Sequence, residues 1–199
     1  MYLYGASGHG KVIRDILNAQ GVRVDAFVDD NPQLSQVDET PVRHQSEGLS
    51  PMIVSIGVNE IRKRVAERLD CRFGVAIHPS AVVSPSAEIG EGTVVMPGAI
   101  INAGAVIGRH CIINTGASID HECMVGDYCH VAPHASLCGQ VRLGEGTLVG
   151  VGASIIPCVS VGEWSVIGAG AAVTQSLPAH CTAVGVPAKV IKNKVQVIV

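Results

Sequence analysis

The sequence predicts a small α/β domain of Rossmann-like β-α-β type followed by a repetitive, all-β domain. Three observations predict this order. A hexapeptide repeat runs without interruption through the second half of the 199 residues. Aromatic residues make up only 3% of the chain while 23 residues are Gly, which indicates a narrow interior built from small and branched side chains. Near the N-terminus, a Gly-rich turn separates a short apolar strand from an amphipathic helix.

The hexapeptide repeat is defined by a branched aliphatic residue at every sixth position. Four residues after each of these stands a second regular residue, which is small or β-branched except for Leu177 in the last repeat. No insertion interrupts the register. The branched residues are Ile77, Val83, Ile89, Val95, Ile101, Ile107, Ile113, Ile119, Val125, Val131, Leu137, Leu143, Val149, Ile155, Val161, Ile167 and Val173.

Each hexapeptide is expected to form one short strand and one turn. It carries only two regular core residues, so it cannot bury them alone and neighbouring repeats must stack. Gly is frequent at the turn positions, for example at Gly92 and Gly146, where the chain has to change direction. The repeat therefore predicts a stack of short parallel strands around a narrow apolar core.

Composition and charge narrow the classes of function. The net charge of −3 gives no whole-chain electrostatic basis for binding nucleic acid or an anionic membrane. The N-terminus lacks the basic and apolar regions of a secretion signal, and no apolar run approaches the ~18 residues of a membrane span. Seven cysteines without a CxxC pair favour reduced thiols. We therefore expect a cytoplasmic protein without a membrane span and without a nucleic-acid partner.

The first seventy residues have the pattern of a parallel β-α-β unit. Apolar positions between the Gly-rich turn and residue 17 follow helical spacing, and two further apolar runs end at acids or Gly. Strands are expected at residues 2–4, 24–28 and 52–56, and a second, charged helix at about residues 59–69.

The turn from Gly5 to Gly10 has exposed backbone N–H groups that suit a phosphate, because strand ends and such a turn form a nucleotide pocket. Its sequence GASGHG is not the GxGxxG motif, and a Gly-rich first turn is a weak signal alone. Nucleotide binding and a merely tight turn therefore both stay open. Asp29 and Asp30 are either acceptors for sugar hydroxyls or solvated acids of a turn.

The stretch IDHECMVGDYCH, residues 119–130, concentrates two histidines, two cysteines and three acids. Cys123 and Cys129 occupy the small core position of successive hexapeptides and are interpreted as buried thiols. His121 and Glu122 stand at the turn, outside both core positions. They are either a solvated polar turn or a catalytic pair.

Six motifs follow one another along almost the whole chain: GASGHG at 5–10, VDD at 28–30, SIGVNEIRK at 55–63, HPSAVVSPSA at 78–87, DHEC at 120–123 and AVGVPAKVI at 183–191. Together and in this order they resemble the motifs of bacterial hexapeptide-repeat sugar O- and N-acyltransferases. This family includes sialic acid O-acetyltransferases, perosamine N-acetyltransferases and the UDP-4-amino-sugar N-acetyltransferases of bacillosamine synthesis, and the resemblance is greatest to the last group.

The resemblance implies a left-handed parallel β-helix with three hexapeptides per coil, so that the seventeen repeats make nearly six coils. Successive hexapeptides then lie on different walls, and Cys123, Cys129 and His121 do not converge on one ion. No metal is therefore expected, because tetrahedral ligation needs four convergent groups. The expected domains are residues 1–74 for a nucleotide-sugar-binding β-α-β domain, 75–180 for the acyltransferase β-helix and 181–199 for a C-terminal tail.

The resemblance also implies acetyl-CoA as the donor and a homotrimer with active sites in clefts between neighbouring β-helices. By that resemblance His121 is the general base, Glu122 orients it, and His130 approaches the acetyl carbonyl. The backbone around Val151 and Ala169 lines the channel for coenzyme A. The implied ligands of the nucleotide-sugar are Ser7, Gly8, His9, Asp29, Asp30 and Gly57.

The expected reaction is direct transfer of an acetyl group to the 4-amino group of a UDP-linked amino-deoxy sugar. An amine loses a proton as it attacks the thioester, and a histidine is suited to accept that proton near neutrality. O-acetylation of a sugar hydroxyl, of the sialic acid type, needs the same base and donor and stays open. A β-helical zinc carbonic anhydrase requires three metal-binding histidines, for which no spacing is found. A non-catalytic binding or scaffold protein would need neither the His-Glu pair nor the N-terminal domain.

Overall fold

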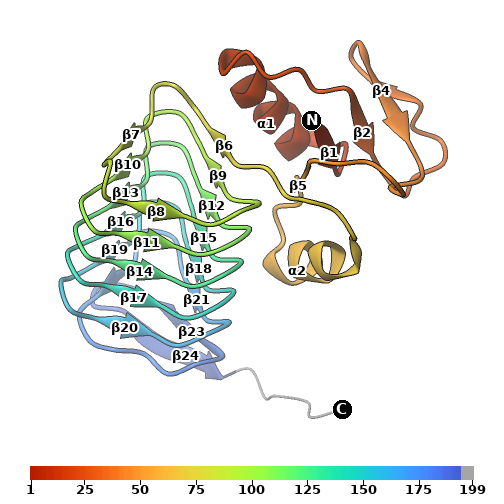
Figure 1. Ribbon diagram of the computed structural model, residues 1–199. Helices are drawn as coiled ribbons and strands as arrows, with labels where there is room; N and C mark the ends of the chain where they lie inside the picture. The colour runs from red at the N-terminus through yellow and green to blue at the C-terminus, as the bar shows by residue number, and fades with distance from the viewer. Residues whose placement is uncertain (194–199) are drawn as a thin grey trace.

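The computed structural model describes residues 1–193 as an α/β unit that packs against a long triangular β-helix (Figure 1). The α/β unit lies beside the first coils, and its second helix lies alongside the β-helix (Figure 1). This architecture confirms the predicted fold class. The division of the chain at residues 74 and 180 stays a proposal.

The α/β unit is a five-stranded sheet in the order β3-β4-β2-β1-β5, in which only the β3-β4 pair is antiparallel. One helix covers each side of the sheet. Leu3, Phe27 and Ile53 pack with α1, while Tyr4 and Val54 pack with α2. The elements are β1 (Tyr2–Tyr4), α1 (Gly8–Ala19), β2 (Ala26–Val28), β3 (Gln36–Val37), β4 (Thr40–Arg43), β5 (Met52–Val54) and α2 (Asn59–Arg68).

The β3-β4 hairpin was not predicted from the sequence. Its segment contains few apolar residues, of which only Val37 is buried, and Pro41 lies within β4. A Pro inside a short run argues against a strand. Here β4 pairs with β2 through Val42 and Arg43, beyond the Pro, so the missing N–H of Pro41 does not interrupt that ladder.

The predicted Gly-rich turn brings the start of α1 close to the sheet. A side chain at Gly10 would place its Cβ 2.4 Å from the carbonyl oxygen of Gly5 and 3.0 Å from the Phe27 ring. Gly5 itself has a φ of 112°, a conformation that L-residues rarely adopt. These two glycines permit the close approach of helix and strand, and the buried positions Ile13, Ile16 and Leu17 then complete the packing.

Seventeen parallel two-residue strands, β6 to β22, form the three faces of the left-handed β-helix (Figure 1). Face 1 contains β6 (Ala76–Ile77), β9 (Val94–Val95), β12 (Ile112–Ile113), β15 (His130–Val131), β18 (Leu148–Val149) and β21 (Val166–Ile167). Face 2 contains β7 (Val82–Val83), β10 (Ile100–Ile101), β13 (Ser118–Ile119), β16 (Ser136–Leu137), β19 (Ser154–Ile155) and β22 (Ala172–Val173). Face 3 contains β8 (Glu88–Ile89), β11 (Val106–Ile107), β14 (Met124–Val125), β17 (Arg142–Leu143) and β20 (Ser160–Val161).

The second residue of each strand points into the core, and equivalent residues stack one coil apart. On face 2, for example, Ile101 pairs with Ile119 and Ile119 with Leu137, and all three are at most 1% exposed. The small residues of the repeat fill the corners of the triangle. We call these corners 1–2, 2–3 and 3–1, after the faces that they join. The first residue of each strand faces outward and is free to differ between coils.

The α/β unit docks on the outer side of face 1. Val94, Met96 and Ile112 are each 1% exposed and belong to the same apolar cluster as Ile13 and Ile16 of α1. Burial of each such side chain contributes about 1.5–3 kcal/mol. The outer side of face 1 in the first coils therefore forms the packing surface for the N-terminal unit.

The chain leaves the hexapeptide register after β22. β23 (Cys181–Val184) extends face 1 in parallel, and β24 (Lys189–Asn193) pairs with β23 in antiparallel orientation. The predicted C-terminal tail covers residues 181–199, of which 194–199 lie outside the described residues. Within residues 1–193, no helix has the length and apolar character to cross a membrane.

Candidate functional site

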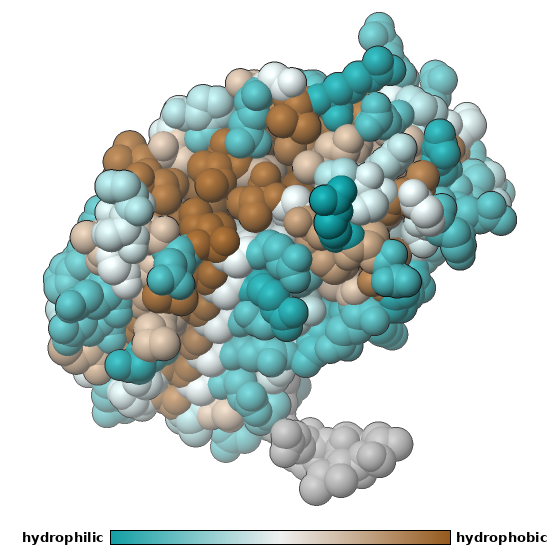
Figure 2. Space-filling model, viewed as in Figure 1, coloured by the Kyte–Doolittle hydropathy of each residue, from teal (hydrophilic) through white to brown (hydrophobic). Residues whose placement is uncertain are grey.

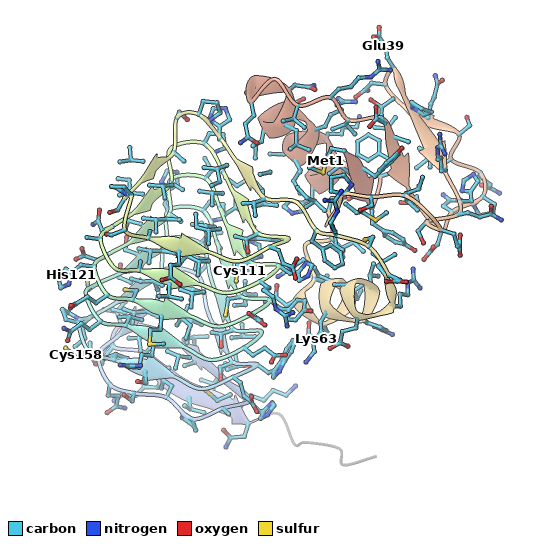
Figure 3. The ribbon with its side chains drawn as sticks, in the orientation of Figure 1. Met1, Glu39, Lys63, Cys111, His121 and Cys158 are labelled. Carbon is cyan, nitrogen blue, oxygen red and sulfur yellow. The ribbon has the colours of Figure 1, made fainter. Side chains whose placement is uncertain are left out.

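His121 and Glu122 lie in the turn between β13 and β14, on corner 2–3 at the outer edge of the β-helix (Figure 3). Their side chains are 56% and 61% exposed, and Nδ1 of His121 lies 3.5 Å from Oε2 of Glu122. The carboxylate of Asp120 accepts a hydrogen bond from the backbone N–H of His121 at 2.8 Å. Glu122 adopts a left-handed conformation with a φ of 57°. This turn lets two adjacent side chains face each other.

Two carboxylates lie at the turn of His121, Glu122 beside the ring and Asp120 at the backbone, and both have lowered pKa values. The amide of Gln140, one coil further along, donates a hydrogen bond to Oε2 of Glu122 at 2.7 Å. This bond, followed by the contact with His121, lowers the pKa of Glu122. The amide of Asn102 likewise lowers the pKa of Asp120. The carboxylate of Glu122 thus stays available as a hydrogen-bond acceptor for the imidazole of His121.

Three cysteines at the small position of the hexapeptide repeat are core residues. Cys111, Cys123 and Cys129 are 0% exposed. Each thiol points to a backbone carbonyl of the following coil at 3.1 Å. Burial raises the pKa of the Cys111 thiol to about 12, so it stays protonated at neutral pH. Within residues 1–193, no three His, Cys, Asp or Glu side chains form a group that could hold a metal ion.

Asp29 shapes the Gly-rich turn at the carboxyl end of the N-terminal sheet. One carboxylate oxygen accepts a hydrogen bond from the N–H of Ala6 at 2.9 Å, and the other accepts one from Asn31 at 2.9 Å. Ser7 and Gly8 are exposed at the start of α1. The carboxylate thus holds the turn, while the exposed side of the turn is formed by Ser7 and Gly8.

Asp30 belongs to a polar group beside that turn. Its carboxylate accepts a hydrogen bond from the Tyr4 hydroxyl at 2.5 Å and an ion-pair contact from Arg68 at 3.1 Å. Burial and the adjacent Asp30 carboxylate raise the pKa of Tyr4 to about 12. Asp30 itself is 71% exposed and faces solvent at the strand end.

His9, Gly57 and His130 lie at the junction between the α/β unit and face 1. A pocket of about 190 Å³ there is lined by Gly57, His130 and the indole of Trp164, together with neighbouring residues of both units. Nε2 of His9 is buried, with no hydrogen-bond partner in the described part of the chain. Burial lowers the pKa of His9 and of His130 to about 4, and the positive charge of Arg62 adds to the effect. Both rings are therefore neutral at physiological pH.

The hydrogen bond between Asn114 and His130 indicates which ring nitrogen carries the proton. The oxygen of the Asn114 amide accepts the N–H of Thr115 at 2.8 Å, so its nitrogen faces Nε2 of His130 at 3.0 Å. An amide nitrogen donates, so Nε2 must accept. The proton of the neutral ring therefore resides on Nδ1, where it is available as a hydrogen-bond donor.

Arg62 is a site residue that the sequence analysis missed. It lies in α2, is 1% exposed, and binds both units. Its guanidinium donates to the carbonyls of Ile56 and Gly57 in the α/β unit, and to the carbonyls of His110 and Tyr128 at corner 3–1, all within 2.8–3.1 Å. Arg62 thus ties the loop before α2 to the β-helix. A charge within a strongly charged helix usually lies on a solvated face, so no feature of the sequence indicates that Arg62 is buried.

Corner 3–1 carries aromatic rings against which α2 rests. The Tyr128 ring stacks on the His110 ring, with centroids 5.2 Å apart and planes within 2°. Lys63 of α2 lies 5.5 Å from the Trp164 ring centroid and also forms an ion pair with Glu145 (Figure 3). Trp164 is therefore a natural reporter of whether α2 is docked.

Val151 and Ala169 lie in stacked turns of corner 1–2. Both are exposed, and the carbonyl of Val151 accepts the N–H of Gly170 at 2.8 Å. The site residues of one chain thus fall into three places: corner 2–3, the junction at face 1, and corner 1–2. A single chain does not bring His121 to His130 or to the Gly-rich turn, because corner 2–3 lies opposite face 1.

Comparisons with known proteins identify both units. Residues 1–69 match the PglD N-terminal domain, and residues 104–139 match the bacterial transferase hexapeptide (six repeats). UDP-N-acetylbacillosamine N-acetyltransferase of Bacillus subtilis (strain 168) is 44% identical over 105 residues, which cover 46% of this chain and 49% of that protein. The chain thus matches about half the length of this curated relative.

Solved structures match over nearly the whole length. Perosamine N-acetyltransferase from Caulobacter crescentus, solved as a histidine-to-asparagine variant with CoA and GDP-perosamine, is 40% identical over 96% of both chains, with a TM-score of 0.91. The acetyltransferase domain of PglB from Neisseria gonorrhoeae FA1090, in complex with acetyl coenzyme A, is 37% identical over 96% of this chain and 98% of that one, with a TM-score of 0.90. The chain belongs to the bacterial hexapeptide-repeat sugar acetyltransferases.

Proposed function

We propose that this protein transfers the acetyl group of acetyl-CoA to the 4-amino group of a UDP-linked amino-deoxy sugar. The observation that carries the proposal is the exposed His121–Glu122 pair, in a chain that shares 40% identity with a perosamine N-acetyltransferase over 96% of its length. The curated relative that acts on UDP-N-acetylbacillosamine supports a UDP-sugar as the acceptor. O-acetylation of a sugar hydroxyl is the alternative, because it uses the same base and donor.

In the proposed mechanism, His121 accepts the proton that the attacking amine loses. Glu122 lies next to Nδ1 and stabilises the imidazolium as it forms. The proposed step needs no cysteine or serine nucleophile, because the amine attacks the thioester directly. His121 then returns the proton to the departing thiolate of coenzyme A, and the transfer is completed without a covalent enzyme intermediate.

His130 is proposed to stabilise the negative charge that develops on the acetyl oxygen. Its ring is neutral, because burial lowers its pKa to about 4, and its Nδ1 carries the proton. A neutral N–H donor suits an oxyanion, which requires a donor at ~2.7–3.1 Å. The backbone around Val151 and Ala169 is proposed to line the channel for coenzyme A.

The N-terminal unit is proposed to bind the nucleotide-sugar. Ser7 and Gly8 stand at the first turn of α1, where free N–H groups and the helix dipole favour a phosphate. Gly57 and His9 adjoin this turn at the domain junction, and Asp29 fixes its shape. Asp30 is an exposed acceptor for a hydroxyl or a base.

We further propose a homotrimer in which each active site uses two copies of the chain. One copy would supply His121 and Glu122, and its neighbour would supply His130 and the N-terminal unit. Apolar outer residues flank corner 2–3, and interfaces between identical subunits are more apolar than the rest of a protein surface. Figure 2 shows apolar side chains gathered on this side of the β-helix, and a groove of about 530 Å³ runs along face 3. The exposed apolar residues are Val82 and Ile100 on face 2 and Val106 and Met124 on face 3.

The test is release of free thiol from acetyl-CoA with a panel of UDP- and GDP-linked sugars, amino and non-amino, with mass analysis of the product. We expect an alkali-stable product, heavier by one acetyl group, only from 4-amino sugars. His121→Ala should lower kcat by roughly 10²–10⁴-fold, the loss expected for a general base, while acetyl-CoA still binds. His78→Ala, a change at a turn histidine near the N-terminal end of the β-helix, is the matched control.

Two results would refute parts of this proposal. Unchanged turnover in His121→Ala would remove His121 as the base. Reaction of hydroxyl sugars or free sialic acid, with no reaction of amino sugars, would assign the protein to the O-acetyltransferases.

A further inference from the structure

The carboxylate of Glu122 has a second partner besides His121. Gln140 occupies the equivalent turn position one coil further along corner 2–3, and its Nε2 donates to Oε2 of Glu122 at 2.7 Å. The same oxygen lies 3.5 Å from Nδ1 of His121. The amide and the imidazole therefore meet on a single carboxylate oxygen, and the amide contact is the shorter one.

We propose that Gln140 is a positioning residue that holds the carboxylate of Glu122 against the imidazole of His121. This inference rests on the proposed function of His121 as a general base. Glu122 is 61% exposed, so its carboxylate needs a restraint to stay beside the ring. A hydrogen bond to an adjacent coil of the β-helix supplies that restraint from a rigid element.

The backbone of this corner supports the proposal. Glu122, Gln140 and Cys158 stand in one column, with φ values of 57°, 61° and 62°. An L-residue has a conformational cost in this region, and glycine is the favoured occupant. Gly104 occupies the same column one coil before Glu122, with a φ of 68°. The non-Gly residues at three successive positions of this column place their side chains next to one another, one coil apart.

Cys158 fixes the orientation of the amide. Its thiol lies 3.4 Å from Oε1 of Gln140 and can donate to it. An amide whose oxygen accepts from a thiol must present its nitrogen on the other side, toward Glu122. The column therefore runs from thiol to amide to carboxylate to imidazole, with each donor facing an acceptor.

The residue before Gln140 provides space for the ring. A Cβ at Gly139 would lie 2.6 Å from Nε2 of His121. The imidazole thus lies over Gly139, on the coil that also carries Gln140. Gly139 therefore leaves space for the imidazole of His121, and Gln140 holds the carboxylate of Glu122.

The charged and titratable groups of this corner define the expected response to substitution. They are Asp120 and Glu122 on the turn of His121, Cys138 and Cys158 on the two following coils, and Arg142 on β17. Gln140→Ala frees the Glu122 carboxylate to move into solvent, so the protonated imidazole loses its partner. Gln140→Glu removes the same donor but places a second carboxylate beside the imidazole, which favours the protonated ring. The two variants should therefore shift the titration of His121 in opposite directions.

The experiment measures that titration directly by NMR of protein labelled with carbon-13 in its histidines. The His121 signal is assigned from its absence in His121→Gln. Gln140→Ala should move the midpoint to lower pH and Gln140→Glu to higher pH. In the proposed acetyl-transfer assay, the acid limb of kcat/KM should move in the same directions. Gln140→Ala should lower kcat about 5- to 10-fold, with KM for both substrates nearly unchanged.

The outcomes separate this inference from the proposed function. Midpoints that coincide with wild type in both variants would overturn the role of Gln140, whether or not activity falls. Opposite shifts in a protein that acetylates no sugar would retain the role of Gln140 and refute the proposed function. Gln20→Ala, the same change at the end of α1, is the control that should move neither readout.

Discussion

Arg62→Met should detach α2 from the β-helix without unfolding the β-helix itself. The five N–H groups of Arg62 make six hydrogen-bond contacts, five to backbone carbonyls and one to the side chain of Asn59. Methionine fills much of the same volume but donates none of these bonds. The carbonyls of Ile56 and Gly57 on one side, and those of corner 3–1 on the other, would remain buried and unpaired.

The free energy that Arg62 contributes to docking is the difference between two opposed contributions. A hydrogen bond from a charged donor contributes about 1.5–3 kcal/mol, so the five N–H donors of Arg62 together form a large favourable sum. Transfer of the guanidinium from water offsets much of it, and this cost is visible in the pKa of Arg62, which burial lowers to about 10. Removing one partner from a buried charged network typically costs about 3–5 kcal/mol. A loss of about 4 kcal/mol would weaken docking roughly 10³-fold.

Trp164 allows the docking to be measured in the intact protein. It is the only tryptophan of the chain, and it lines the pocket beside Gly57 and contacts Lys63 of α2. In Arg62→Met its emission should shift to the red, and amide hydrogens of α2 should exchange faster, while the far-ultraviolet signal of the β-helix persists. Arg64→Met, an exposed change on the same helix, is the matched control. Unaltered emission and exchange in Arg62→Met would refute the role of Arg62 as the tie between the units.

Two further predictions concern buried histidines and the shared active site. His110 is 2% exposed, and burial lowers its pKa to about 4. As the pH falls, the unfolded chain therefore binds a proton at this histidine before the folded chain does. The free energy of unfolding should decrease by up to about 3 kcal/mol as the pH falls from about 6.5 to about 4. His110→Phe should flatten the dependence of the unfolding free energy on pH by about one proton in that window, and an unchanged slope in urea titrations would contradict it. Co-expressed His121→Ala and Gly8→Trp chains should regain about a quarter of wild-type turnover if each site of a trimer uses two copies, whereas no recovery would place the whole site within one chain.

The β-helix could be predicted almost completely because its core uses only two positions in six. A branched residue at one position and a small residue four places later recur through the repeat, and the structure buries them as expected. Handedness could not be derived from that period and came from the resemblance. The outward residues Val94 and Ile112 are apolar because α1 covers them. A second apolar residue beside the regular one is therefore the sequence signal for a covered face.

The candidate site was less accessible to sequence reasoning. The turn position of His121 and Glu122 is fixed by the register, but their contact depends on the left-handed conformation of Glu122. The sequence around Arg62 indicates a solvated charge, and the backbone carbonyls that Arg62 binds become evident only in the fold. The separation of His121 from His130 follows from the assignment of their strands to different faces. Nine residues apart in sequence, they lie on opposite sides of the coil.

The geometry of the coil explains why function gathers in columns on this fold. Residues 18 apart are stacked neighbours, and a turn position carries no core side chain that the repeat must conserve. At corner 2–3, Glu122, Gln140 and Cys158 form a stacked column of polar side chains. At corner 3–1, rings stack over glycines, for example Trp164 over Gly146. Substitution at one turn should therefore be felt first at the turn 18 residues away, before its neighbours in sequence. The proposed catalytic pair therefore depends on two coils. His121 and Glu122 lie on one coil, and Gln140, which holds the carboxylate of Glu122, lies on the next.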